Sequence, residues 1–312
     1  MLRKSAFLCP VLYFVISLLV FFADRLDGAV LSPGGSYYLS AVILQFLVFL
    51  LPSFVFCRLR SADYLKKLNL RPVGLEAVGI TLLSVFLMIA GGWLIRLGQI
   101  FLAPGGREAS LHFTTALTRS AHVGEIVSSG IAFCLVPAVC EELVFRCVLP
   151  CTYFEERYGS VVVGFLTSLL FAMLHFDAAQ LAPLFWNGMV LFLMTVVTGS
   201  VFPAMIAHFL FNIYAVFGET YVLTMMRSTY SVSILFFVCA VLFLLFLAGF
   251  LGQCERVMNE HADLDRPTPL RVTERRRLYP TRADRAVHDL GIFASLSFFV
   301  CALFYGIAVF AA

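Results

Sequence analysis

The sequence predicts an all-α fold, a polytopic bundle of about nine transmembrane helices. Of the 312 residues, 61% are hydrophobic and only 13% are charged, and the mean hydropathy is +0.94. Soluble domains average about 45–50% apolar and about 25% charged residues. The apolar residues come in runs of about 17–25, which is long enough to cross a bilayer core as a helix. The composition excludes a disordered chain, a collagen-like chain and a nucleic-acid-binding domain, all of which need polar or basic surface.

Nine apolar runs satisfy the length and hydropathy expected of membrane spans. In chain order they cover residues 7–23, 37–56, 74–102, 125–157, 160–176, 182–198, 202–217, 232–251 and 290–311. The first run follows Arg3 and Lys4, so it also fits a cleaved signal peptide. We favour a retained helix, because no clear cleavage site of small residues follows it.

The basic residues predict how the helices are oriented. With nine spans, sixteen Lys and Arg residues fall on the side of the N-terminus and four on the other side, with Arg96 and Arg146 inside helices. Basic residues gather on the cytoplasmic side of membrane proteins. We therefore expect a multi-pass protein of the cell membrane with a cytoplasmic N-terminus.

The chain divides into three parts on this interpretation. Residues 1–122 hold the first three helices, residues 123–217 hold the polar motifs described below, and residues 218–312 hold the last two helices. These last two are joined by a polar, Arg-rich stretch at 252–289. We interpret this stretch as a cytoplasmic linker that also contacts anionic lipid, with a regulatory or partner-docking role as the alternative.

Ionisable residues interrupt the fourth apolar run. Glu142 and Arg146 are four residues apart, so they lie on one helix face and can form an ion pair. Glu141 lies about 100° around the helix and must find its partner on another helix. A carboxylate held in an apolar site suits a general base acting on water. The alternative for all three is a structural charge cluster that holds helices together.

His175 is predicted to be the partner of Glu141. A turn at Tyr158-Gly159 separates two antiparallel helices, and Glu141 and His175 each lie 17 residues from Tyr158. Their side chains should therefore lie at similar depth. Phe171 precedes His175 by four residues and should pack over its ring. An intramembrane histidine can equally serve only as an interhelical hydrogen-bonding residue.

His208 and Asn212 repeat the four-residue spacing on the seventh run. The two side chains point to one side of the helix, and both can donate hydrogen bonds. Aimed at a cavity, the pair can stabilise a developing oxyanion. Aimed at a neighbouring helix, it provides polar interhelical contacts instead.

The three motifs together carry a family resemblance. Glu-Glu-x-x-x-Arg at 141–146, Phe-x-x-x-His at 171–175 and His-x-x-x-Asn at 208–212, in this order over about 123–217, resemble the CAAX protease and bacteriocin-processing family of intramembrane proteases, which includes the type II CAAX prenyl endopeptidases. Many relatives have Gly after the motif arginine, where this chain has Cys147.

The resemblance implies a catalytic role for each motif residue. Glu141 and His175 would bind and activate the attacking water, and His208 and Asn212 would stabilise the oxyanion. Glu142 and Arg146 would shape the site and balance its charge. Zinc is left open: Glu141, His175 and His208 could bind it, but the chain has no His-Glu-x-x-His signature, and a glutamate-activated water needs no metal.

The expected function is an intramembrane endopeptidase acting on peptide or protein substrates that are membrane-proximal or lipid-anchored. A proton- or cation-coupled transporter is the alternative from another class, because buried carboxylates also serve ion relays. A catalytically silent scaffold or immunity protein of the same family is the third. The lipid bilayer is the other expected partner, and no nucleic acid is expected.

Overall fold

The computed structural model describes residues 8–23, 37–60, 68, 70–102, 123–155, 158–226, 229–263, 281–293 and 295–311. These residues form helices and turns, with no strand among them. With η for π-helical segments, the elements are α1 (Leu8–Phe21), α3 (Tyr37–Gln45), η3 (Phe46–Leu50), α4 (Leu51–Arg60), α5 (Glu76–Leu102), α7 (Val123–Ser129), η5 (Gly130–Leu135), α8 (Val136–Glu142), η6 (Leu143–Val148), α9 (Leu149–Glu155), α10 (Ser160–Met173), α11 (Leu181–Thr198), α12 (Phe202–Ile213), η7 (Tyr214–Gly218), α13 (Glu219–Met225), α14 (Thr229–Asp263), α16 (Arg282–Gly291) and α17 (Leu296–Ala311).

Six helical stretches in the described part of the chain are long and apolar enough to cross a membrane. They are Tyr37–Arg60, Ala77–Leu102, Val123–Glu155, Leu181–Thr198, Phe202–Met225 and Tyr230–Glu260. Three shorter apolar helices, Cys9–Phe21, Ser160–Met173 and Phe298–Phe310, coincide with the other three predicted runs. The all-helical, multi-pass membrane architecture is therefore confirmed, and the count of nine spans stays a prediction.

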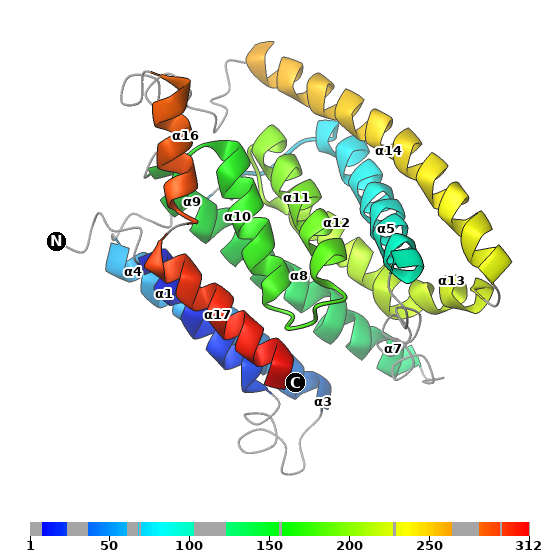
Figure 1. Ribbon diagram of the computed structural model, residues 1–312, viewed down its shortest axis with the longest axis horizontal. Helices are drawn as coiled ribbons and strands as arrows, with labels where there is room; N and C mark the ends of the chain where they lie inside the picture. The colour runs from blue at the N-terminus through cyan, green and yellow to red at the C-terminus, as the bar shows by residue number, and fades with distance from the viewer. Residues whose placement is uncertain are drawn as a thin grey trace.

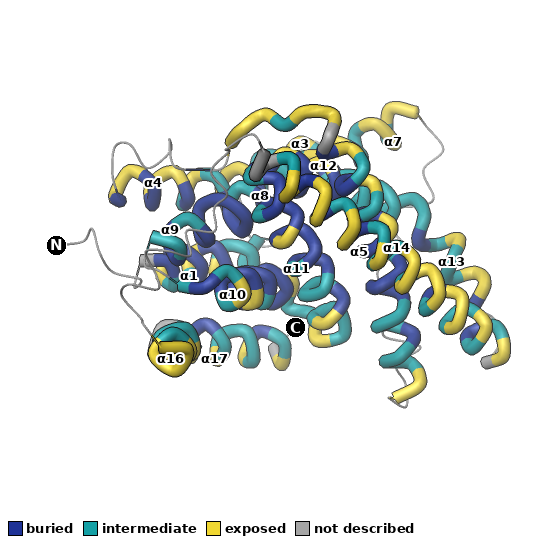
Figure 2. Tube along the Cα trace, turned by 90° about the horizontal axis from the view of Figure 1, so that it is seen from above, coloured by how far each residue is buried: buried dark blue, intermediate teal, exposed yellow. Residues whose placement is uncertain are grey.

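The helices form a layered bundle. α1 and α17 lie side by side at one edge, and α14 packs along α5 at the opposite edge (Figure 1). α10, α11 and α12 lie between these edges, and α12 contacts α8. Figure 2 shows α11 buried over much of its length and α14 largely exposed. The middle of the bundle therefore offers the most enclosed environment for polar groups.

The close approach of α10 and α11 depends on small residues. A Cβ placed on Gly188 of α11 would lie 2.9 Å from the Cβ of Ser168 on α10, which is closer than side-chain atoms pack. Small residues let helix backbones approach each other in membranes, where lipid removes the hydrophobic driving force between helices. This packing places α10, and the turn that follows it, firmly against the centre of the bundle.

Several contacts bring the predicted cytoplasmic helix ends to one end of the bundle. Arg60 at the end of α4 pairs with Glu155 at the end of α9, with 3.0 Å between Nη2 and Oε2. The hydroxyl of Ser200, after α11, donates to the carbonyl of Arg71, before α5. The start of α5 also lies beside the end of α14, because Gly79 faces the Gln253 side chain. The grouping agrees with the charge-based topology, and which side of the membrane it faces stays a prediction.

The predicted linker at 252–289 stays a prediction, and the described residues at both of its ends are largely helical. α14 continues to Asp263, twelve residues past the end of the apolar run, and Arg256 and Glu260 form an i, i+4 ion pair there at 2.9 Å. Such pairs support exposed helix, so the helix outlasts its apolar stretch. α16 begins with a capping box formed by Thr281 and Asp284. The remainder of this stretch, 264–280, lies outside the described residues.

Candidate active site

The helix that carries Glu141 and Glu142 is not a regular α-helix. The π-helical segments η5 and η6 flank the seven residues of α8. The N–H groups of Val136 and Leu149 donate to carbonyls five residues back, and each of these residues directly precedes a proline. Proline lacks an N–H and its ring clashes with the carbonyl four residues back, so the backbone widens before Pro137 and Pro150. Such π segments are frequent at functional sites.

The same arrangement occurs in another helix without motif residues. η3 ends at Leu50, and the N–H of Leu51 donates to the carbonyl of Phe46, five residues back. Pro52 follows directly. The prolines inside the apolar runs are therefore the sequence signal for these three segments.

Glu142 lies at the centre of the polar cluster. It is fully buried, and one carboxylate oxygen, Oε2, lies 3.3 Å from Arg146 Nε. The predicted i, i+4 ion pair is thus confirmed. The other oxygen, Oε1, lies 2.9 Å from His208 Nδ1 on α12. The sequence did not indicate this second partner, which makes Glu142 the link between Arg146 and His208.

Arg146 is enclosed almost completely, with 1% of its surface exposed. Its guanidinium carbon lies 5.2 Å from the centre of the Phe171 ring, a cation–π distance. Its guanidinium nitrogens make no hydrogen bond with the residues that the structure describes, so Glu142 and the ring face balance its charge. Removing either partner would leave a buried cation poorly compensated.

Glu141 faces the second ring nitrogen of His208. Oε2 of Glu141 lies 3.9 Å from Nε2 of His208, which is too long for a hydrogen bond but within reach of one bridging water. No hydrogen bond or ion pair joins Glu141 to His175 in the described part of the chain. Glu141 therefore finds its partner on another helix, as predicted, and the partner that the structure shows is His208.

The run at 160–176 was predicted to be helical throughout, but His175 lies outside the helix. α10 ends at Met173, and His175 is exposed in the turn that follows. Its Nδ1 lies 3.1 Å from the Phe171 carbonyl. The helix ends early because Phe176 adopts a positive φ of 50°, a conformation that continues no right-handed helix. A proton on Nδ1 would be donated to that carbonyl and would leave Nε2 free to bind water.

Phe171 brings the two histidines together. Its ring centre lies 5.2 Å from that of His175 and 5.8 Å from that of His208, so the predicted packing of Phe171 over His175 is confirmed. It also contacts Phe145 at 5.5 Å. Phe145 and Phe171 each lie 13 residues from Tyr158, which supports the register proposed for the hairpin that carries Glu141 and His175.

Asn212 reaches a neighbouring helix. Its Nδ2 donates to the carbonyl of Cys134 in η5, at 3.4 Å. This contact corresponds to the interhelical alternative that the sequence left open. The role of Asn212 at an oxyanion stays a prediction, and the bond fixes α12 against the helix that carries the two glutamates.

The three zinc candidates do not form a metal-binding group in this structure. Among the described residues, no cluster of three or more His, Cys, Asp or Glu side chains has a geometry that could hold a metal ion. The site does bring together His208, Glu141, Glu142 and Arg146 by direct or near contacts, with Phe171 joining His175 to them. These groups can hold and move protons around a water molecule.

A known protein family matches the part of the chain that contains the site. Residues 124–214 match the family model described as type II CAAX prenyl endopeptidase Rce1-like. The matched stretch contains all seven residues of the three motifs, and it confirms the resemblance seen in the sequence. The search of curated proteins and the search of solved structures found no match.

Proposed function

Starting from the match of residues 124–214 to type II CAAX prenyl endopeptidases, we propose that this protein is an intramembrane endopeptidase that uses a glutamate-activated water. One observation carries the proposal: the imidazole of His208 lies between two carboxylates, 2.9 Å from Glu142 and 3.9 Å from Glu141. A carboxylate and an imidazole supply the base and the hydrogen-bond donor that hydrolysis of a peptide by water requires.

Glu141 is the general base in this proposal. Water attacks the scissile carbonyl carbon while Glu141 takes one of its protons, and His175 holds the water through its free ring nitrogen. A new C–O bond forms, and the electron pair of the C=O bond moves to its oxygen. When the tetrahedral intermediate collapses, the C–N bond breaks, and the proton held by Glu141 passes to the leaving amine. The products are a carboxylic acid and an amine.

His208 supplies the oxyanion site. For this role its ring carries a proton on each nitrogen, so that Nδ1 donates to Glu142 and Nε2 donates to the oxyanion. Glu142 then orients the imidazole and balances its charge, much as the buried aspartate does in serine proteases. Arg146 holds the opposite oxygen of Glu142. Asn212 is the second donor in this proposal, provided that it turns from Cys134.

The substrates proposed are peptide bonds close to the membrane or in lipid-anchored chains. The apolar surroundings of the cluster exclude bulk water, which strengthens the interactions within it. The family match favours hydrolysis over the transporter alternative, since the same residues belong to an endopeptidase family model. The proposed chemistry uses side chains and water alone.

The test uses two libraries of quenched fluorescent peptides, one with a C-terminal farnesylated cysteine and one without lipid. The purified full-length protein in lipid nanodiscs should cleave at least one library, and mass spectrometry should identify a single new amide cleavage per product. Glu141→Gln protein, prepared identically, should cleave neither. Equal cleavage by both proteins would point to a contaminating protease and contradict the proposal, as would absence of cleavage by the wild type in both libraries.

A further inference from the structure

The turn that carries His175 is fastened by polar contacts that the proposed reaction does not use. Asp177 accepts hydrogen bonds through Oδ1 from the backbone N–H groups of Ala179, at 2.8 Å, and Gln180, at 3.3 Å. An aspartate that bonds the backbone two residues ahead forms a defined turn. Residues 174–180 therefore have an internal structure of their own between α10 and α11, and we call them the His175 turn.

α5 holds this turn from one side. Arg96 Nη2 donates to Gln180 Oε1 at 2.7 Å, and Gln99 Nε2 donates to the carbonyl of Ala179 at 3.1 Å. Both donors lie on α5, some eighty residues away in the chain. An arginine inside an apolar helix is unfavourable to insert into a membrane, so such residues are seldom present without a role.

Arg96 is itself fixed in place. It forms an ion pair with Glu219 at the start of α13, and both side chains are largely buried. Its guanidinium carbon lies 5.6 Å from the Trp93 ring centre, and Trp93 donates from its indole nitrogen to the hydroxyl of Tyr214. The guanidinium group therefore has one orientation, with one nitrogen directed at Glu219 and another at Gln180.

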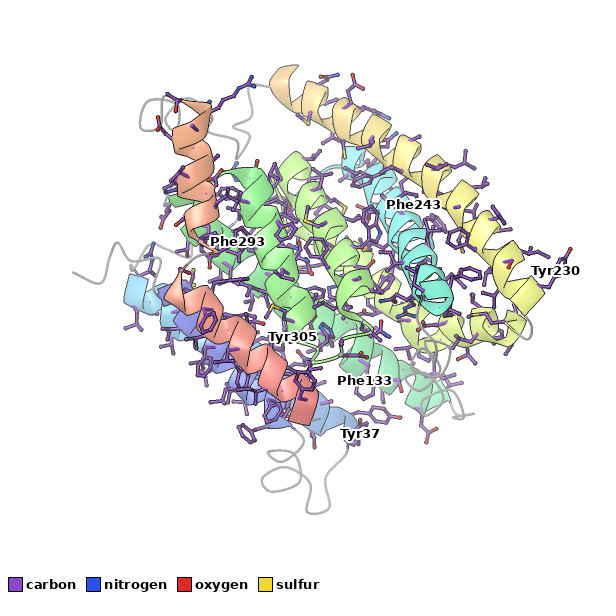
Figure 3. The ribbon with its side chains drawn as sticks, viewed as in Figure 1. Tyr37, Phe133, Tyr230, Phe243, Phe293 and Tyr305 are labelled. Atoms are coloured by element: carbon purple, nitrogen blue, oxygen red, sulfur yellow. The ribbon has the colours of Figure 1, made fainter. Side chains whose placement is uncertain are left out.

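Aromatic packing holds the turn from the other side. Phe176 follows His175 directly, and its ring centre lies 5.7 Å from that of Phe21 on α1 and 5.9 Å from that of Phe304 on α17. Its ring also stacks on Tyr305, which Figure 3 shows on the side of α17 that faces α10. Positive φ is unfavourable for a bulky residue, so the surrounding contacts must maintain this conformation.

We propose that Arg96 is a positioning residue, which acts through Gln180 to hold His175 beside Phe171. This inference rests on the proposed function, because His175 needs a fixed place only if it holds the attacking water. Two independent anchors, polar on α5 and aromatic on α1 and α17, converge on the turn that exposes the motif histidine. A displacement of about 1 Å at a reacting group can lower turnover about a hundredfold.

Two variants test the polar anchor. Arg96→Gln removes the whole contact, whereas Gln180→Ala removes the acceptor and leaves the Arg96–Glu219 pair in place. Gln180→Glu is the rescue variant, since it keeps an acceptor oxygen for Arg96 and places a favourable negative charge at the N-terminus of α11. Arg60→Gln is the matched control, because it breaks another buried arginine ion pair at the opposite end of the bundle.

Two readouts are made on the full-length protein in nanodiscs. Hydrogen–deuterium exchange of residues 174–180 reports on the turn, and the kcat and KM for a cleaved fluorescent peptide report on His175. We expect Arg96→Gln and Gln180→Ala to exchange faster in this turn and to lose about tenfold or more in kcat, with KM within about twofold. Gln180→Glu and Arg60→Gln should match the wild type in both.

Each outcome decides the inference. Unchanged exchange in Gln180→Ala would overturn the anchor, whatever the activity. Faster exchange with unchanged kcat would show a role in stability alone and would overturn the positioning role. If the wild-type protein cleaves no peptide, the proposed function fails separately and takes the positioning role with it, while exchange still decides whether Arg96 anchors the turn.

Discussion

Two adjacent glutamates have different environments at the centre of this protein. Glu142 is fully buried between Arg146 and His208. Glu141 keeps 8% of its surface exposed, and its Oε2 lies 3.9 Å from Nε2 of His208. A carboxylate with both oxygens occupied is suited to holding other groups, and one with a free oxygen is suited to taking a proton from water. These environments support the proposed roles, a structural one for Glu142 and a catalytic one for Glu141.

The two amide variants should separate these roles. Glu141→Gln keeps the size of the side chain and removes the base, so we expect turnover to be lost and the melting temperature in detergent to change little. Glu142→Gln leaves Arg146 without its counter-ion, and breaking a buried ion pair typically costs about 3–5 kcal/mol. A clear fall in melting temperature should result. Full peptide cleavage by Glu141→Gln would show that the base is another residue.

Local geometry explains which residue contacts the sequence could predict. The Glu142–Arg146 pair follows from a four-residue spacing that any helical turn nearly preserves, and the structure confirms it. The partner of Glu141 depends on how two distant helices are rotated about their axes. The π segments on both sides of α8 alter that rotation, so depth alone pointed to His175 and missed His208.

At the scale of the helix, prolines determine how the glutamates are presented. Pro52, Pro137 and Pro150 each follow a π-helical segment after one intervening residue. A π turn holds about one residue more than an α turn, so each segment changes the direction of all side chains beyond it. The wide turn before Pro137 thus helps to direct Glu141 and Glu142 toward α12.

Pro137→Ala should weaken this effect. The new N–H can bond the carbonyl of Phe133, which favours a regular α-helix through η5. We expect the melting temperature to stay the same or rise and kcat to fall about tenfold or more, as the glutamates rotate away from His208. Pro52→Ala is the control, because it makes the same change in η3, far from the motifs in sequence. Equal kcat in the two variants would contradict the role given to Pro137.

At the scale of the whole molecule, the apolar runs predicted where the helices lie, and the basic residues predicted how the helices are oriented. Each predicted run overlaps a helix, because burying backbone polar groups in lipid leaves few alternatives to helical structure. The extension of α14 was missed, because hydropathy shows which residues suit the bilayer and does not show where a helix ends outside it. The His175 turn was also missed, because its anchors on α1, α5 and α17 are distant in the chain.

Three arginines lie at one end of the bundle and His175 lies toward the other, which determines from which side of the membrane a substrate reaches His175. Arg60, Arg71 and Arg256 lie at or beside one end, through contacts between α4 and α9, α11 and α5, and α5 and α14. α10 starts at that end and runs away from it, so the exposed His175 lies toward the opposite end. With the basic end in the cytoplasm, as the charge distribution predicts, the His175 turn faces the outer side of the membrane.

Cysteine labelling in sealed cells tests this orientation. Ala178 is exposed in the His175 turn, and Leu70 is exposed just before α5 at the basic end. We expect a membrane-impermeant maleimide to label Ala178→Cys in intact cells and to label Leu70→Cys only after permeabilisation. The native cysteines give a low background because eight of the nine are buried. Reporter fusions after Arg71 and Arg277 should be cytoplasmic and one near Arg119 external. Labelling of Leu70→Cys alone in intact cells would invert the orientation and place His175 toward cytoplasmic substrates.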